Sequence, residues 1–166
     1  MSKAKLIQSN KTNSLNKYYT ITKILLTITP FVALMYLSMQ SIKIGTNFTD
    51  LIRLEPKFNI LFLVSMINPF IAYLLVFIQR KIEENDISYA VVNIVIFIIS
   101  EILLQNILYV ALFAFLLYKT LKTYNTTIKN SFKDKLHNKF LMTISGSLVV
   151  FGLACICLFA TIRINM

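Results

Sequence analysis

Polar side chains recur in the long apolar stretch from residue 88 to residue 118, and they are the residues best placed to do chemistry. Tyr89, Asn93, Glu101, Gln105 and Tyr109 follow steps of four, which Phe97 interrupts. Positions four apart share a helix face, so the sequence predicts one slowly winding polar seam. A carboxylic acid costs roughly 3 kcal/mol to insert at the centre of a hydrocarbon core, so Glu101 is expected to face protein or water.

Such a seam supports two main kinds of chemistry. In the first, its side chains hydrogen-bond to neighbouring helices, and each contact contributes about 1 kcal/mol. In the second, Glu101 holds a proton or a cation on a path across the membrane, because intramembrane acids often mark such paths. A pocket for a ligand or peptide is a third use. Asn68 and Ser65, in the preceding apolar stretch, are expected to face the seam. No Lys, Arg or His lies at similar depth in another stretch, so burial favours the neutral acid.

Membrane-spanning helices must position these groups. The chain has 166 residues, of which 57% are apolar and 14% charged, which is too hydrophobic for a soluble domain of this size. A span needs about 20 apolar residues, and the sequence supplies several such stretches. We therefore predict an all-α integral membrane four-helix bundle that follows a polar basic tail at residues 1–22. The predicted spans lie near residues 23–40, 57–79, 88–118 and 141–164.

The third stretch is longer than a bilayer requires. As one helix it would measure about 45 Å against a hydrocarbon core of about 30 Å, so the third helix should extend beyond the bilayer. The connection at 119–140 has apolar residues at every fourth position with lysines between them, which is typical of a basic amphipathic helix at a bilayer surface. An extension of the third helix is the other interpretation. The lysines expected to contact lipid are Lys122, Lys129, Lys133, Lys135 and Lys139.

Two prolines fall inside predicted spans. Pro30 and Pro69 lack the backbone N–H that a helix interior needs, so the sequence predicts a kink at each. Thr27 and Thr29 have hydroxyl groups that can bond the freed carbonyl groups in lipid. At Asn68-Pro69 a re-entrant loop of two half-helices is the alternative to a kinked continuous helix.

The distribution of Lys and Arg does not orient four plain crossings. Eight would lie on the side of the N-terminus and nine on the other, whereas a membrane protein carries its excess on the cytoplasmic side. If the third stretch folded back near Glu101, the counts would become thirteen and four. Each half would then hold only about a dozen residues, which is short for a span. We predict four full crossings, and both orientations stay open, with the N-terminus inside as the preferred one.

Signatures of an enzyme or a metal site are missing from the sequence. HExxH, CxxC, a phosphate-binding Gly-rich loop and a nucleophile elbow are absent, and Glu101 lacks the second deep carboxylate that intramembrane hydrolysis would need. His137 is predicted to be a surface residue. Cys155 and Cys157 point to nearly opposite sides of a helix, so they cannot bridge each other. We predict no enzymatic activity, no cofactor and no metal.

The formal net charge is +10, and the Lys and Arg residues that carry it lie between apolar stretches. This placement favours anionic lipid headgroups over nucleic acid as the partner. This outline of a small basic four-span chain, rich in Ile, Asn and Lys, resembles bacteriocin-immunity and other accessory membrane proteins of low-GC bacteria. The resemblance implies an accessory, immunity or regulatory protein of the bacterial plasma membrane that binds another membrane component or forms a homo-oligomer. The alternative is a small oligomeric transporter or channel that uses Glu101 with Gln105 and Asn68.

Overall fold

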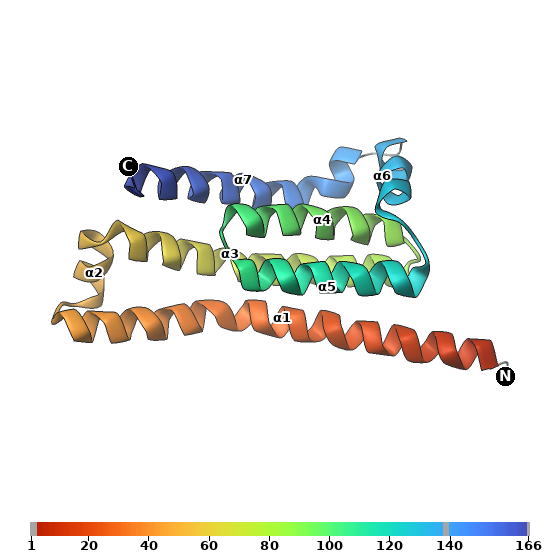
Figure 1. Ribbon diagram of the computed structural model, residues 1–166, viewed down its shortest axis with the longest axis horizontal. Helices are drawn as coiled ribbons and strands as arrows, with labels where there is room; N and C mark the ends of the chain where they lie inside the picture. The colour runs from red at the N-terminus through yellow and green to blue at the C-terminus, as the bar shows by residue number, and fades with distance from the viewer. Residues whose placement is uncertain (1–2, 138–139, 166) are drawn as a thin grey trace.

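The computed structural model describes residues 3–137 and 140–165, which form a bundle of helices (Figure 1). The helices are α1 (Lys3–Ile44), α2 (Phe48–Leu54), α3 (Pro56–Glu83), α4 (Ile87–Leu103), α5 (Ile107–Tyr124), α6 (Ile128–His137) and α7 (Phe140–Asn165). Within the described residues, α1, α3, α5 and α7 are long and apolar enough to cross a membrane. The prediction of an all-α membrane helical bundle is confirmed.

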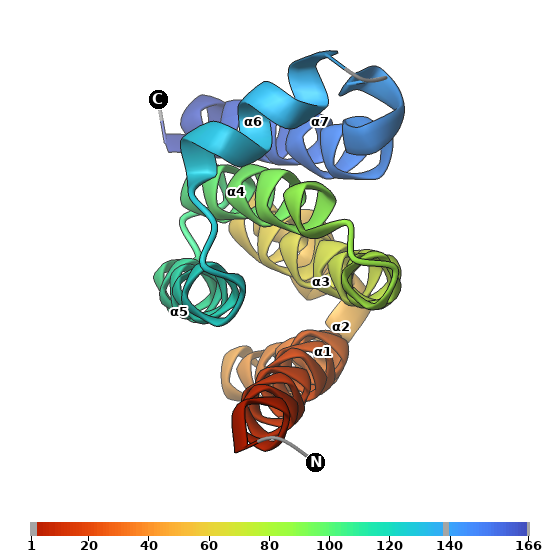
Figure 2. The same ribbon diagram turned by 90° about the vertical axis from the view of Figure 1, so that its right-hand side faces the viewer.

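The long helices lie along the longest axis of the molecule (Figures 1 and 2). Helices α1, α4 and α7 run in one direction, and α3 and α5 run in the other. One end of the bundle, called the N-terminal end below, therefore holds the start of α1, the turn at residues 84–86 and helix α6. The opposite end, called the C-terminal end, holds α2 and the end of α7.

The stretch from residue 88 to residue 118 is not one helix. It is broken between α4 and α5, which lie antiparallel and side by side (Figure 1). Gln105 adopts the left-handed conformation with φ of 59°, and the N–H of Asn106 donates to the carbonyl of Glu101 at 2.9 Å. These are the features of a Schellman helix end. The prediction of one long third helix is wrong, because the chain turns between α4 and α5. The turn is hard to predict, because it contains neither the glycine nor the proline that usually marks one.

Contacts between helices fix the depth that this hairpin reaches. Lys23 of α1 donates to the Gln79 amide oxygen of α3 at 2.8 Å, which marks where the apolar part of the bundle begins. From that level α1 and α3 each continue for about 20 residues, or about 30 Å, which matches a hydrocarbon core. Helix α5 extends only about 20 Å from Thr120 to its first residue. Helices α4 and α5 therefore form a hairpin whose turn lies short of the far ends of α1 and α3 (Figure 1), which is the geometry of a re-entrant hairpin.

The polar stretch at residues 1–22 is helical from Lys3 onward and is continuous with the first span. Helix α1 therefore has 42 residues and is about 63 Å long. Leu15 and Tyr19 are buried at 2% and 0% exposure, because α1 packs against both α3 and α5. The spacing of Leu15, Tyr19, Thr22 and Leu26 is a helix face that the polar composition obscured.

Both prolines lie inside continuous helices, Pro30 in α1 and Pro69 in α3. The continuity of α3 excludes the two half-helices considered for Asn68-Pro69. Thr27 and Thr29 donate to the carbonyls of Lys23 and Leu25, at 2.8 and 3.0 Å, and not to the Leu26 carbonyl that Pro30 leaves without its helix donor.

The basic connection at 119–140 divides into two parts. Its first residues extend α5 to Tyr124, and Asn125 then ends that helix in the left-handed conformation with φ of 50°. Helix α6 follows and crosses the N-terminal end of the bundle over α4 and α7 (Figure 2). The first part is therefore an extension of the preceding helix and the second part a separate helix, whose position at a bilayer surface stays a prediction.

Candidate functional site

The residues of the predicted polar seam do not all face one helix; they contact several different parts of the bundle. Asn93 faces α7, Tyr109 faces α1, Glu101 lies in the core, and Gln105 forms the turn of the hairpin. The division follows from the turn at Gln105, because residues before and after it belong to helices that run in opposite directions. The residues of the hairpin therefore bond it to both flanking spans.

Asn93 holds α4 against α7. Its side chain is 2% exposed, and its amide nitrogen donates to the Tyr89 carbonyl at 2.8 Å and to the Thr143 carbonyl at 3.1 Å. Its amide oxygen accepts a hydrogen bond from the Ser147 hydroxyl. These hydrogen bonds use both the donor and the acceptor of the buried amide, so Asn93 has a structural role.

Tyr109 holds α5 against α1. Its hydroxyl donates to the Leu25 carbonyl at 3.3 Å and is also hydrogen-bonded to the Thr29 hydroxyl. Nearer the N-terminal end, the hydroxyls of Tyr19 and Thr120 join the same two helices at 3.1 Å. This second contact is not expected from the sequence, because the polar residues around Tyr19 are typical of a tail.

The turn between α4 and α5, residues 104–108, is called the hairpin tip. Gln105 is exposed there, and the side chains of Ile107 and Leu108 are 83% and 66% exposed. Asn106 precedes α5 and its side chain makes no capping hydrogen bond to the first turn. The first N–H groups of α5 have no partner within a helix, so polar backbone donors stand level with the apolar parts of α1 and α3.

Glu101 and Asn68 form the least satisfied part of the core. Both side chains are 0% exposed, and within the described residues their polar atoms make no hydrogen bond of normal geometry, although the Asn106 side chain lies near the Glu101 carboxyl group. Asn68 lies 17 residues before Asn85 in the turn, and Glu101 lies 16 after it. Because α3 and α4 are antiparallel neighbours, the two groups share one depth. Such unpartnered groups cost about 1–3 kcal/mol each unless water or another molecule bonds them.

Ser65 lies one turn from Asn68 on α3 and is 4% exposed. Its hydroxyl donates to the Phe62 carbonyl of its own helix at 2.6 Å. It therefore makes a local bond, and the candidate polar site consists of Glu101 and Asn68. A carboxyl group and an amide at one depth can each bond a water molecule or a small polar group, and the carboxyl group can also hold a proton.

A metal site is not formed by these groups. The described residues contain no cluster of three or more His, Cys, Asp or Glu side chains. A single carboxyl and an amide fall short of the ligand number that bound divalent cations require.

The basic residues predicted to meet lipid have different roles. Lys135 pairs with Asp86 at 2.7 Å, and Asp86 also accepts the Tyr89 N–H at 3.1 Å as the cap of α4. Lys122 donates to the Tyr118 hydroxyl at 3.3 Å. Lys129 and Lys133 are exposed on α6, and Lys139 lies outside the described residues. The role of Asp86 was missed, although an acid just before a helix is a capping signal.

Comparisons with protein-family models, with curated proteins and with solved structures gave no match. The geometry offers two features with chemical potential, the hairpin tip and the buried groups of Glu101 and Asn68. Both lie in or against the re-entrant hairpin.

Proposed function

We propose that this protein is a non-catalytic membrane protein that binds another membrane-embedded chain through the hairpin tip. The observation that carries the proposal is the exposure of Gln105, Ile107 and Leu108 beside uncapped N–H groups at bilayer depth. Non-helical backbone is tolerated at that depth only where protein or water surrounds it, because each unsatisfied polar group costs several kcal/mol in lipid. A partner at the tip would supply that surrounding.

The chemistry of the tip specifies what the partner should offer. The first turn of a helix presents free donors and the positive end of the helix dipole, so it favours hydrogen-bond acceptors. The bulky side chains of Ile107 and Leu108 favour apolar contact. A membrane helix with a hydroxyl, amide or acidic group among apolar residues meets both conditions. An accessory, immunity or regulatory protein acts through contacts of this kind.

The positions of Lys and Arg support one orientation in a bacterial plasma membrane. Those at the N-terminal end of the bundle are Lys3, Lys5, Lys11, Lys17, Lys23, Arg80, Lys81, Lys119, Lys122, Lys129, Lys133 and Lys135. Those at the C-terminal end are Lys43, Arg53, Lys57 and Arg163. The cytoplasmic side of a membrane protein carries the excess, so the N-terminal end is assigned to the cytoplasm.

The partner proposal is tested by co-purification in mild detergent from the native membrane. The double variant Ile107→Ala/Leu108→Ala removes two exposed side chains of the tip and should weaken recovery of the partner about tenfold, as expected for two contact residues. The control Leu148→Ala/Ile156→Ala removes the same two residue types from exposed positions on α7 and should leave recovery unchanged.

Equal recovery with both double variants would overturn the role of the tip. Recovery of the chain alone, as a monomer or as a multimer of itself, would overturn the proposed hetero-partner. Neither result depends on knowing the partner beforehand, because the captured protein is identified by mass spectrometry.

A small transporter or channel is the second candidate, and the unpartnered state of Glu101 and Asn68 favours it. A buried acid that no protein group satisfies is a suitable proton site. In proteoliposomes with a pH gradient, Glu101→Gln should abolish proton flux while the protein stays folded. For the first candidate the same variant should retain the captured partner. The two functions are therefore separated by one substitution.

A further inference from the structure

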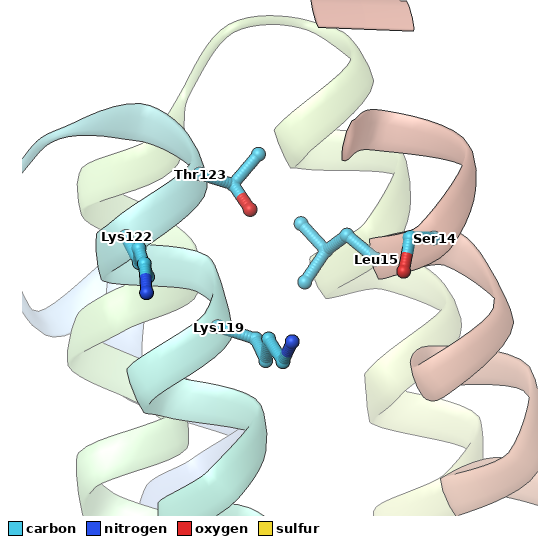
Figure 3. Close-up of a pocket in the computed structure, with 5 residues that line it drawn as sticks. All are labelled: Ser14, Leu15, Lys119, Lys122 and Thr123. Carbon is cyan, nitrogen blue, oxygen red and sulfur yellow. The ribbon is translucent and has the colours of Figure 1, made fainter. Parts of the chain in front are cut away.

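We propose that a cavity between α1 and α5 at the N-terminal end binds the phosphate group of an anionic phospholipid. The cavity has a volume of about 140 Å³ and is lined by Ser14, Leu15, Lys119, Lys122 and Thr123 (Figure 3). It is large enough for several water molecules, and so for a phosphate group. Figure 3 shows Lys119 and Thr123 on one side of the gap, with Ser14 and Leu15 on the other.

The two lysines of this phosphate cavity carry charges that no acid neutralises. Neither α1 nor α5 contains Asp or Glu. Within the described residues, the ion pairs are Lys81 with Glu84 and Lys135 with Asp86, so Lys119 and Lys122 take part in none. Two ammonium groups without a counter-ion beside one cavity favour an anionic occupant.

Lys119 is positioned by two aromatic rings. Its ammonium lies 5.3 Å from the ring centroid of Tyr18 on α1 and 5.5 Å from that of Phe115 on α5. The two rings also pack edge to face, with centroids 5.1 Å apart. These contacts hold the cation between the two helices, where Figure 3 shows it reaching from α5 toward α1.

Hydroxyl groups supply the remaining donors. Ser14 and Thr123 come from opposite walls, and neither hydroxyl is hydrogen-bonded within the part of the chain that the structure describes. Phosphate oxygens accept bonds from ammonium and hydroxyl groups together, and the charge-assisted bonds are the stronger ones.

The depth of the cavity identifies the source of the phosphate as a lipid. It lies about one helical turn beyond the contact of Tyr19 with Thr120, toward the basic end of the bundle. On the bilayer side of it, Ile21, Leu25 and Phe115 expose apolar side chains at 51%, 41% and 45%. Acyl chains would cover these side chains while the headgroup phosphate enters the cavity. Basic pockets between membrane helices on the cytoplasmic side bind headgroups in this way.

The test measures lipid binding to the full chain in detergent by native mass spectrometry. The probes are phosphatidylglycerol and phosphatidylcholine with identical acyl chains, and the wild-type chain should retain the first in preference. The variant Lys119→Gln/Lys122→Gln should weaken phosphatidylglycerol binding about 30-fold, from about 1 kcal/mol for each lysine. The control Lys129→Gln/Lys133→Gln removes the same charge from exposed positions on α6 and should change binding less than about threefold.

A second variant tests the cavity without changing charge. Ser14→Leu fills the space from an exposed position and should also lower phosphatidylglycerol binding, whereas melting followed by circular dichroism should be unchanged for every variant. Unchanged lipid binding in both site variants overturns the proposal, as does an equal loss in the α6 control, which would show diffuse attraction. Displacement of the lipid by glycerol 3-phosphate or inorganic phosphate at comparable concentration would overturn the lipid as the source.

Discussion

Two apolar regions of this protein carry a polar interruption at their middle, yet only one of them turns. Helix α3 continues through Asn68-Pro69 for its full 28 residues. The region from residue 87 to residue 124 turns back at Gln105 and Asn106, although neither residue is glycine or proline. Local helix-breaking tendency would have placed the turn at the proline.

Packing accounts for the difference. In α3 the buried residues Ile67, Ile71 and Leu75 keep one face of the helix against its neighbours on both sides of the proline. The hairpin instead brings Phe97 of α4 and Phe113 of α5 together, with ring centroids 5.7 Å apart and both side chains fully buried. Within lipid the gain comes from van der Waals packing of the two rings, about 0.5–1.5 kcal/mol for an aromatic pair, which offsets much of the roughly 1–2 kcal/mol cost of a left-handed residue. Contacts distant in sequence therefore decide where the chain turns.

The most decisive test of the difference between the two regions is to determine which side of the membrane each connection occupies. In a background with Cys155→Ser and Cys157→Ala, single cysteines at Asn85, Thr126 and Thr46 would be labelled with an impermeant reagent. Because the hairpin returns, the cysteines at 85 and 126 should label from one side and that at 46 from the other. Labelling is all or none at each position.

A cysteine at Thr126 that labels together with one at Thr46 would contradict the hairpin. It would restore four plain crossings and, with them, the long third helix. The cysteine at Asn85 serves as the internal control, because both topologies place it on the side of the N-terminus.

The next effect concerns the turn itself. Gln105→Gly removes the steric cost of the left-handed conformation and should raise the free energy of unfolding by about 1 kcal/mol, whereas Gln105→Val should lower it by about 1–2 kcal/mol. Denaturation in detergent micelles measures both. Leu108→Val, at an exposed helical position, should change stability by less than about 0.5 kcal/mol. A destabilising Gln105→Gly would mean that the Gln105 side chain, and not its backbone, maintains the turn.

The smallest effect is expected in α3. Pro69→Ala restores an N–H that can donate to the Ser65 carbonyl, so stability should rise by up to about 1 kcal/mol without any change in cysteine labelling. Val76→Ala, at an exposed position on the same helix, should alter stability by less than about 0.5 kcal/mol. A loss of several kcal/mol in Pro69→Ala would show that the proline is needed for packing, and the contrast between the two regions would need another explanation.

Hydropathy located the apolar stretches well, because it is a local property of the chain. The stretches 23–40, 57–79 and 141–164 lie inside α1, α3 and α7. The stretch 88–118 is expected to be one helix because a fold near Glu101 would leave only about a dozen residues in each half. The structure instead gives α4 17 residues and α5 18, because α5 continues beyond the stretch to Tyr124. The count of thirteen basic residues against four already favoured folding back near Glu101.

The buried polar residues of the candidate site could be predicted from the sequence, but the hydrogen bonds between helices could not. The apolar surroundings of Glu101 and Asn68 made their burial predictable, whereas the bonds of Asn93 to Ser147 and of Tyr109 to Thr29 depend on the register of helices far apart in sequence. Gln105 was assigned to the polar seam from its spacing alone, and its left-handed backbone removes it from that helix face. Pairwise spacing is informative only within one unbroken helix.

Helix α1 is continuous and about twice as long as the hydrocarbon core is thick. A change of about 10° in its tilt within the bilayer would displace its free end by about 5 Å, since about 30 Å of helix projects from the membrane. Tyr109 holds this helix near its middle and Tyr19 holds it at the membrane surface. Movement of the hairpin in the lipid would therefore be transmitted, with amplification, to the aqueous phase.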